Sequence, residues 1–424
     1  MKNKINILTL LIGSMAIASS ASAVDYIGNK SGKTNSFQNK AAGCSQAETK
    51  KTLEFNNVSA LIETGGKMWQ NQSLGVAAYE VPRNSNQFLI FSGSLWVGGE
   101  DANGQLKLAA MKFGSDGNDF WTGPLSVTPN TGNPAIGRKD FGPATIDGAT
   151  CTQYDKFYIT SRAEILEFNG WFETPAAQQA TEFPGYAVPA SILNWPAHGD
   201  LGKFQDFNLA PFYDRDGDGV YNPGNGDYPW YDIKQEVDCR NDRQITLYGD
   251  YNMWWVFNDK GDIHTESGGE PIGMEIRSQA FAFATSNEIN NSTFYNYELF
   301  NRSTQTLYNT YFGLMVDVAL GGPNDDYVGC DVSRGLGYSY NGDDFDGDEM
   351  GFSGYGENPP AVGVDFFEGP YQDNDNFDNP FTSDYTIAQS QKGIPYKGLG
   401  IGYGDGIIDN ERFGMRKFLY YNNT

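Results

Sequence analysis

The sequence predicts a mainly β protein, built of antiparallel β-sandwich domains with long Gly/Pro/Asp-rich loops and one or two short helices. Three observations favour this class. Aromatic residues make up 14% of the chain and glycine 51 of its 424 residues, whereas charged residues make up only 19%. Short apolar runs alternate with turn-forming residues along most of the length. In residues 309–321 apolar side chains recur at every second position, as in a strand with one buried face.

The first residues predict export. Lys2 and Lys4 precede an apolar run over 5–18, and small residues at 21–23 are typical of a signal-peptidase site. We therefore expect residues 1–23 to be a signal peptide and residues 24–50 to be a flexible polar segment. The apolar run is too short for a permanent membrane helix, and no later run is long enough, so we expect no membrane insertion after signal cleavage.

Residues 51–212 are expected to form an N-terminal β-rich region with one short helix. The clearest strand pair lies in 86–113, where two apolar runs flank a polar turn. Asn103 and Gly104 in that turn are the residue types that supply two positive φ angles, so a type I′ hairpin is predicted.

The one well-signalled helix of this region is predicted over residues 162–168. Ser161 and Glu164 have the spacing of a capping box, in which each side chain satisfies a backbone N–H of the other residue. Asn169 and Gly170 follow as a stop signal. We expect this helix to connect two sheets.

The remaining chain divides into a calcium-loop and connecting-strand region at 213–270 and a β-sandwich with acidic loops at 271–424. The last region is expected to be incomplete at the C-terminus, because the chain stops on an apolar-aromatic run. It also contains a long acidic stretch, 335–391, without Lys or Arg. Strands are predicted at 251–259, 275–285, 292–303 and 309–321, the last three joined by short polar turns.

Charge and cysteine content restrict the partners and the compartment. The net charge of −24 disfavours nucleic acid and anionic membranes and suits divalent cations or neutral glycans. The four cysteines are widely spaced, which makes a zinc ribbon improbable. In an oxidising compartment they allow up to two disulfides with three possible pairings, and isolated buried thiols are the alternative.

The segment DRDGDG, residues 214–219, is the strongest candidate site. Alternating aspartates followed by Gly219 match the first half of a calcium-binding loop, in which carboxylates converge as the chain curls. Asn225 replaces the final glutamate of an EF-hand, and Pro211 and Pro223 are incompatible with its flanking helices. A solvated acidic turn is the alternative. The predicted ligands are Asp214, Asp216, Asp218, the carbonyl group of Val220, and Asp227 as the closing carboxylate.

Other acidic clusters are weaker candidates for the same ion, because solvated loop ends would have the same composition. Oxygen ligands favour Ca²⁺ over zinc or copper, so Ca²⁺ is the predicted cofactor. The second cluster is Asp317, Asp325, Asp326 and Asp331; the third is Asp344, Asp346 and Asp348, with Glu349 beside it; a fourth is Asp373, Asp375 and Asp378; the last is Asp405, Asp409 and Glu411.

Catalytic motifs are scarce. With only His198 and His264, an HExxH metalloprotease motif is absent and a Ser-His-Asp triad has little support. Glycoside hydrolysis needs only two carboxylates. A polysaccharide-degrading hydrolase, or its ancillary carbohydrate-binding module, is therefore the alternative hypothesis for the function. Tryptophans at 121, 195, 230 and 254–255 could stack on sugars, although a place in the core is the commoner role.

Several longer blocks carry a family resemblance over most of residues 51–424. They include LEFNNVSALIETGGKMW, FSGSLWVGGEDANGQLKLAA, DRDGDGVYNPGNGDYP, WWVFNDKGDIHTESGG and NDDYVGCDVSRGLGYSYNGDD. With these blocks the chain resembles large exported proteins of the Bacteroidota that usually end in a type IX secretion sorting domain. The resemblance implies contact with secretion machinery and passage to the cell surface or medium. It implies no catalytic residues, and no sorting domain is visible in this sequence.

Together these features predict a secreted, calcium-stabilised cell-surface protein. We expect it to act in adhesion, extracellular assembly or polysaccharide binding rather than in catalysis. Its expected partners are polysaccharides or other cell-surface proteins.

Overall fold

The structure is a computed structural model that describes residues 42–111, 117–128, 141–349, 351–372, 374–382, 384, 386–387 and 400–420. The predicted signal peptide, most of the predicted flexible segment and Asp373 lie outside the described residues. The fold is mainly β, as predicted, and all strand pairs within its sheets are antiparallel. None of the helices in the described part is both long enough and apolar enough to span a bilayer.

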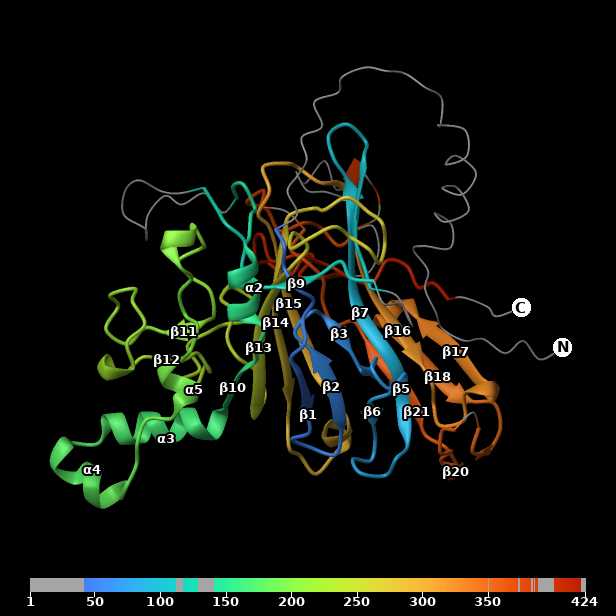
Figure 1. The fold of residues 1–424 in the computed structure, drawn as a ribbon, viewed down its shortest axis with the longest axis horizontal. Coiled ribbons are helices and arrows are strands. Elements are labelled where there is room, and N and C mark those ends of the chain that lie inside the picture. The colour runs from blue at the N-terminus through green and yellow to red at the C-terminus, as the bar shows by residue number, and fades with distance from the viewer. Residues whose placement is uncertain are drawn as a thin grey trace.

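Two sheets form the centre of the molecule (Figure 1). The first sheet contains β1 (Lys50–Leu53), β2 (Ser59–Glu63), β3 (Lys67–Met68), β6 (Tyr79–Glu80), β7 (Phe88–Glu100), β8 (Leu106–Ala109) and β16 (Tyr308–Val318). The second sheet contains β9 (Trp121–Thr122), β10 (Tyr158–Ser161), β13 (Tyr251–Asn258), β14 (Met274–Ala282) and β15 (Phe294–Asn301). One hydrophobic core draws on both sheets, so they pack face to face as a sandwich.

Smaller elements surround this sandwich. A third sheet is formed by β17 (Asp326–Asp331), β18 (Leu336–Asn341) and β21 (Ala361–Asp365). Four two-stranded ribbons are β4 (Gln70–Asn71) with β5 (Val76–Ala77), β11 (Phe212–Tyr213) with β12 (Tyr228–Pro229), β19 (Phe345–Asp346) with β20 (Gly356–Glu357), and β22 (Gly400–Ile401) with β23 (Arg412–Phe413). The helices are α2 (Gly148–Tyr154), α3 (Arg162–Glu173), α4 (Ala176–Glu182) and α5 (Ala190–Leu193), with 3₁₀ turns η1 (Leu201–Lys203), η2 (Pro223–Asn225), η3 (Glu288–Asn291), η4 (Pro323–Asp325) and η5 (Val332–Arg334).

Strand β13 joins two cores, because it is buried on both faces. Met253, Trp255 and Phe257 point into the core between the sheets. Trp254 and Val256 point the other way, into a second core formed with α3, α5 and the loops that follow. The period-two alternation of a strand therefore places a layer of helices and loops on the outer face of the second sheet (Figure 1).

Helix α3 confirms the predicted start and extends beyond the predicted end. Ser161 and Glu164 form the complete capping box. The chain does not stop at Asn169, whose side-chain amide donates to the Ile165 carbonyl group and lies inside the helix. The helix ends instead at Glu173, and its C-cap Thr174 has the extended backbone that the following proline favours. The described residues contain four short α-helices, more than the one or two predicted.

The predicted hairpin of β7 and β8 is confirmed, but its predicted type I′ turn is wrong. Gly104 has a φ of +75°, whereas Asn103 is not among the residues with positive φ. Asp101 is the reason, because its side chain accepts hydrogen bonds from the N–H groups of Asn103 and Gln105. A side-chain-stabilised turn thus replaces the two-residue loop.

The predicted strands near 275–321 are confirmed as β14, β15 and β16, although they do not lie in one sheet. Strands β14 and β15 pair with each other in the second sheet. After β15 the chain crosses over, and β16 pairs with β7 in the first sheet. The core between the sheets therefore combines residues from 51–212 with residues from 271–424.

One disulfide joins Cys44 to Cys151, over a sequence separation of 107 residues. It links the segment before β1 to helix α2. Closing a loop of this length stabilises the folded state by about 4–5 kcal/mol in the chain-entropy treatment. Cys239 and Cys330 are free and exposed, so one of the possible bridges forms and the other two cysteines do not pair.

Candidate metal sites

The DRDGDG loop lies in a closed hairpin, between β11 and β12. Phe212 pairs with Pro229 and Tyr213 with Tyr228, which brings both ends of the segment 214–227 together. Tyr228 is fully buried in the second core, and the Tyr213 ring stacks on it at 4.9 Å between centroids. The loop is thereby anchored to the layer that covers the outer face of the second sheet.

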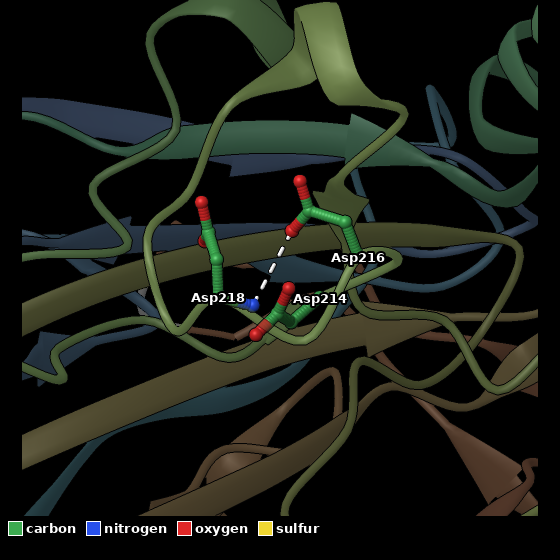
Figure 2. Close-up of side chains that lie close together, drawn as sticks. All are labelled: Asp214, Asp216 and Asp218. Atoms are coloured by element: carbon green, nitrogen blue, oxygen red, sulfur yellow. Dashed lines mark hydrogen bonds between the residues drawn. The ribbon is translucent and has the colours of Figure 1, made fainter.

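The structure brings Asp214, Asp216 and Asp218 together (Figure 2). Each offers one carboxylate oxygen, and these three atoms all lie within 4.8 Å of one another. Among the described residues, this is the group of three or more acidic, histidine or cysteine side chains that meets this spacing. Two of the three aspartates are exposed, so an ion could approach from solvent.

Backbone N–H groups hold these carboxylates in place. Asp214 accepts from Gly217 at 2.8 Å and from Gly219 at 2.7 Å. Asp218 accepts from Val220 at 2.7 Å. Gly217 and Gly219 have φ angles of +72° and +77°, which L side chains rarely adopt, so both glycines are needed for the curl. A carboxylate oxygen can accept a hydrogen bond and still bind an ion with its other lone pair.

Two further residues of the loop have different places. Asp227 is fully buried at the base of the hairpin, where it accepts hydrogen bonds from the N–H groups of Arg215 and Asn222, at 2.9 and 2.8 Å. Burial raises its pKa, and the charges of Asp214 and Asp216 add to the effect. The predicted closing carboxylate thus fixes the loop and is not in the group of three. Val220 is half exposed, and its N–H binds Asp218.

His198 binds the backbone of the loop through its imidazole ring. The N–H of Tyr221 donates to its Nε2 at 2.8 Å, so the ring proton is on Nδ1, which donates to the Phe207 carbonyl group at 3.0 Å. The ring stacks on Phe207 at 4.0 Å between centroids, and burial lowers the pKa of the imidazole. Both ring nitrogens are engaged by the backbone, which is a structural role rather than acid-base catalysis.

The second predicted cluster does not stay together. Asp317 lies within β16, where burial alone raises its pKa to about 7. Asp331 ends β17 and accepts from the Ser333 hydroxyl group, which lowers its pKa. Asp325 and Asp326 remain side by side at the start of β17.

The structure does not bring the carboxylates of the third or the last predicted cluster together as one group either. Asp344 and Asp348 are exposed, whereas Asp346 between them is 1% exposed. Asp405 accepts from the N–H of Ile407 in its own loop, whereas Asp409 and Glu411 accept from the N–H groups of Asn376 and Asn379, so the three carboxylates bind backbone groups and do not meet the metal-site spacing. The glycine loop nearby is bound by Asp378, which accepts from Gly404 and Gly406, both at 2.7 Å.

A buried His264 with two carboxylates was not anticipated. Its Nδ1 lies 2.7 Å from the Leu108 carbonyl oxygen and its Nε2 lies 2.8 Å from that of Asp259. Both contacts are made to backbone oxygens, which fix the position and the plane of the ring. The carboxylates of Asp119 and Asp259, both fully buried, lie 3.7 and 4.0 Å from the ring nitrogens. Asp259 and His264 lie five residues apart in the loop between β13 and β14, whereas Asp119 lies far earlier in the chain, before β9, so no sequence spacing indicates this group.

The tryptophans considered for sugar stacking are core residues. Trp121, Trp195, Trp254 and Trp255 are all buried, and only Trp230 of that set is partly accessible.

The buried acid Glu275 is neutralised by Arg277 and Arg302, at 3.0 and 2.9 Å. Such a pair of arginines holds the pKa of Glu275 below its ordinary value despite full burial. Glu275 is therefore a structural ion-pair residue.

Comparison of the chain with protein-family models, with curated proteins and with solved structures gave no match.

Proposed function

We propose that this protein is an extracellular, calcium-stabilised β-sandwich protein of the cell surface that binds other molecules rather than transforming them. The observation that carries the proposal is the group Asp214, Asp216 and Asp218, held within 4.8 Å on a hairpin loop. Three carboxylates so close repel one another, and a bound Ca²⁺ would remove that repulsion.

Export is supported by the disulfide and by the sequence. Cys44–Cys151 connects two segments of the described chain, and disulfides persist in oxidising compartments. The apolar start of the sequence and the resemblance to exported Bacteroidota proteins point to the same compartment. In that compartment, calcium modules typically bind at about 10⁻⁴–10⁻³ M.

A binding role is favoured by the state of the residues that could act in catalysis. Both ring nitrogens of His198 and both of His264 are engaged by the backbone. The proposed partners are a polysaccharide or another cell-surface protein, approached through exposed loops.

Thermal unfolding tests the calcium part of the proposal. At 10 mM Ca²⁺ and a dissociation constant of about 10⁻⁴–10⁻³ M, linkage stabilises the folded state by about 1.4–2.7 kcal/mol. We expect a Tm higher by several degrees in calcium than in chelator, and slower protease cleavage within 214–227. The double variant Asp216→Asn/Asp218→Asn should lose this difference, whereas exposed Asp344→Asn should keep it. Equal Tm values for the wild type in calcium and in chelator would contradict the proposal.

Affinity electrophoresis in soluble polysaccharides tests the binding part. Retarded migration without release of reducing ends supports a binding protein. Release of reducing ends that is lost on substituting a single Asp or Glu would support the hydrolase instead.

A further inference from the structure

The third sheet, formed by β17, β18 and β21, turns a tyrosine-bearing face to solvent. The sheet lies at one side of the molecule (Figure 1). Val362 of β21 is buried in the core between the two central sheets, and its partner in β18, Ser339, is 1% exposed. Because side chains alternate along a strand, Tyr338 and Tyr340 point to the opposite face. Tyr340 is 45% exposed, so this opposite face is accessible.

Three tyrosine rings form a row on the accessible face. Tyr327 of β17 pairs with Tyr340 of β18, and their ring centroids lie 6.0 Å apart with an angle of 23° between the ring planes. The centroid of the Tyr338 ring lies 6.2 Å from that of Tyr340, with an angle of 32° between the planes. Neighbouring rings are thus only moderately inclined to each other, and they adjoin as one aromatic surface.

Two glycines let the outer rings of this row lie against the backbone. A Cβ on Gly329, which pairs with Tyr338, would lie 2.4 Å from Cζ of the Tyr338 ring. A Cβ on Gly342 would lie 2.5 Å from Cε2 of Tyr327. Each of these rings therefore covers the bare backbone of a glycine with one side. Because Tyr327 and Tyr338 are both partly exposed, the side turned away from the glycine is the accessible one.

The surroundings of the row favour a neutral ligand with many hydroxyl groups. Asp331 and Asp365 lie on the same face, as the two partners of Leu336. The stretch 335–391 contains twelve acidic residues and neither Lys nor Arg, and this charge repels nucleic acid, anionic lipid and acidic glycans. Carboxylates and tyrosine hydroxyl groups accept hydrogen bonds from sugar hydroxyl groups, whereas the flat aromatic rings pack against the apolar C–H face of a sugar.

Two other kinds of partner fit this face less well. Ammonium groups are recognised by aromatic rings arranged as a cage, whereas these three rings adjoin one another in a single row. Protein interfaces are centred on large anchoring side chains packed in pockets. The positions on either side of Tyr338 are Gly329 and Gly363, which offer no such anchor.

We propose that the tyrosine face, formed by Tyr327, Tyr338 and Tyr340, is a binding platform for a neutral polysaccharide whose sugar rings stack along the row. The inference rests on the binding part of the proposed function. It commits that part to a polysaccharide and places the ligand on a sheet face rather than on the loops. It uses no residue of the 214–227 hairpin, so it does not depend on calcium binding there.

Affinity electrophoresis of single-residue variants tests the platform, with gels that contain hydroxyethyl cellulose, galactomannan, arabinoxylan or dextran. We expect at least one of these neutral polysaccharides to retard the wild type. Tyr340→Ala should raise the dissociation constant about tenfold, because one stacking surface is lost. Tyr340→Phe should keep most of the affinity, because the ring remains. The control Tyr308→Ala removes an exposed tyrosine of β16 and should bind as the wild type does.

The failure of the platform can be told apart from the failure of the proposed function. Retardation that is the same in Tyr340→Ala and the wild type would overturn the platform and leave a polysaccharide-binding protein. A wild type that none of these polysaccharides retards would overturn the platform, whereas the calcium part is decided separately by thermal unfolding. Dimers of the wild type that are lost in Tyr340→Ala would assign the face to a second copy of the chain and overturn the polysaccharide.

A second measurement uses the wild type alone and so does not depend on the folding of a variant. Tetranitromethane nitrates accessible tyrosines, and mass spectrometry locates the modified residues. Saturation with the retarding polysaccharide should slow nitration of Tyr340 at least several-fold and leave that of Tyr308 unchanged, since both tyrosines are exposed in the free protein. Nitration of Tyr340 at the same rate with and without the polysaccharide overturns the proposal.

Discussion

Asp317 gives a prediction whose size follows from the structure. It lies in β16 opposite Ser92 of β7, on the strand face that also carries Met315. Burial raises its pKa from 3.8 to about 7. The folded chain therefore binds the proton more tightly than the unfolded chain does. This contribution to stability is fully present below about pH 4 and is lost as the pH rises to about 7.

The magnitude is bounded by the pKa difference. About three pKa units at roughly 1.4 kcal/mol each give an upper limit of about 4 kcal/mol. Because Asp317 keeps some solvent exposure, we expect about 2 kcal/mol. The variant Asp317→Asn cannot ionise, so its stability relative to the wild type should rise by this amount between pH 4.5 and pH 8.

Urea unfolding at the two pH values, in chelator, measures the effect. Asp344→Asn, on an exposed loop, controls for the general effect of removing one negative charge. If the difference between Asp317→Asn and the wild type is the same at both pH values, the burial argument is refuted.

Three further predictions concern stability. Substituting both Cys44 and Cys151 by Ser should lower the free energy of unfolding, measured with urea, by about 4 kcal/mol. The control Cys239→Ser should have little effect, because Cys239 is free and exposed. An equal loss of stability in both variants would argue against the bridge. His264→Gln should lower the free energy of unfolding by about 1–3 kcal/mol, because the buried contacts of the two ring nitrogens with the Leu108 and Asp259 carbonyl oxygens are lost. A near-neutral result would show that these contacts do not stabilise the fold. Asp227→Ala should cost about 1–3 kcal/mol and speed proteolysis of the β11–β12 hairpin, because two partly buried N–H groups lose their acceptor. Unchanged cleavage would show that Asp227 does not fix the loop.

Local features were predictable from the sequence. The capping box at Ser161 and the hairpin around Gly104 depend on residues a few positions apart, and both form. The three aspartates of the DRDGDG loop are likewise close in sequence, and the structure brings them together.

Features that depend on tertiary contacts were not predictable. Nothing in the periodicity of β16 indicates that it joins β7 rather than β15. The acidic clusters were grouped by sequence, whereas the fold separates Asp317 from Asp326 and brings Asp346 to the turn beside it. That Cys44 bridges Cys151, while Cys239 and Cys330 stay free, depends on the placement of α2 against the segment before β1, which no local pattern indicates.

The most direct test of the central claim is a crystal structure of the protein grown in calcium, with anomalous scattering data. We expect an anomalous peak within the β11–β12 hairpin, at about 2.3–2.6 Å from oxygens of Asp214, Asp216 and Asp218. A well-ordered hairpin at the same calcium concentration, with these carboxylates bound only to backbone N–H groups and no anomalous peak between them, would contradict the account.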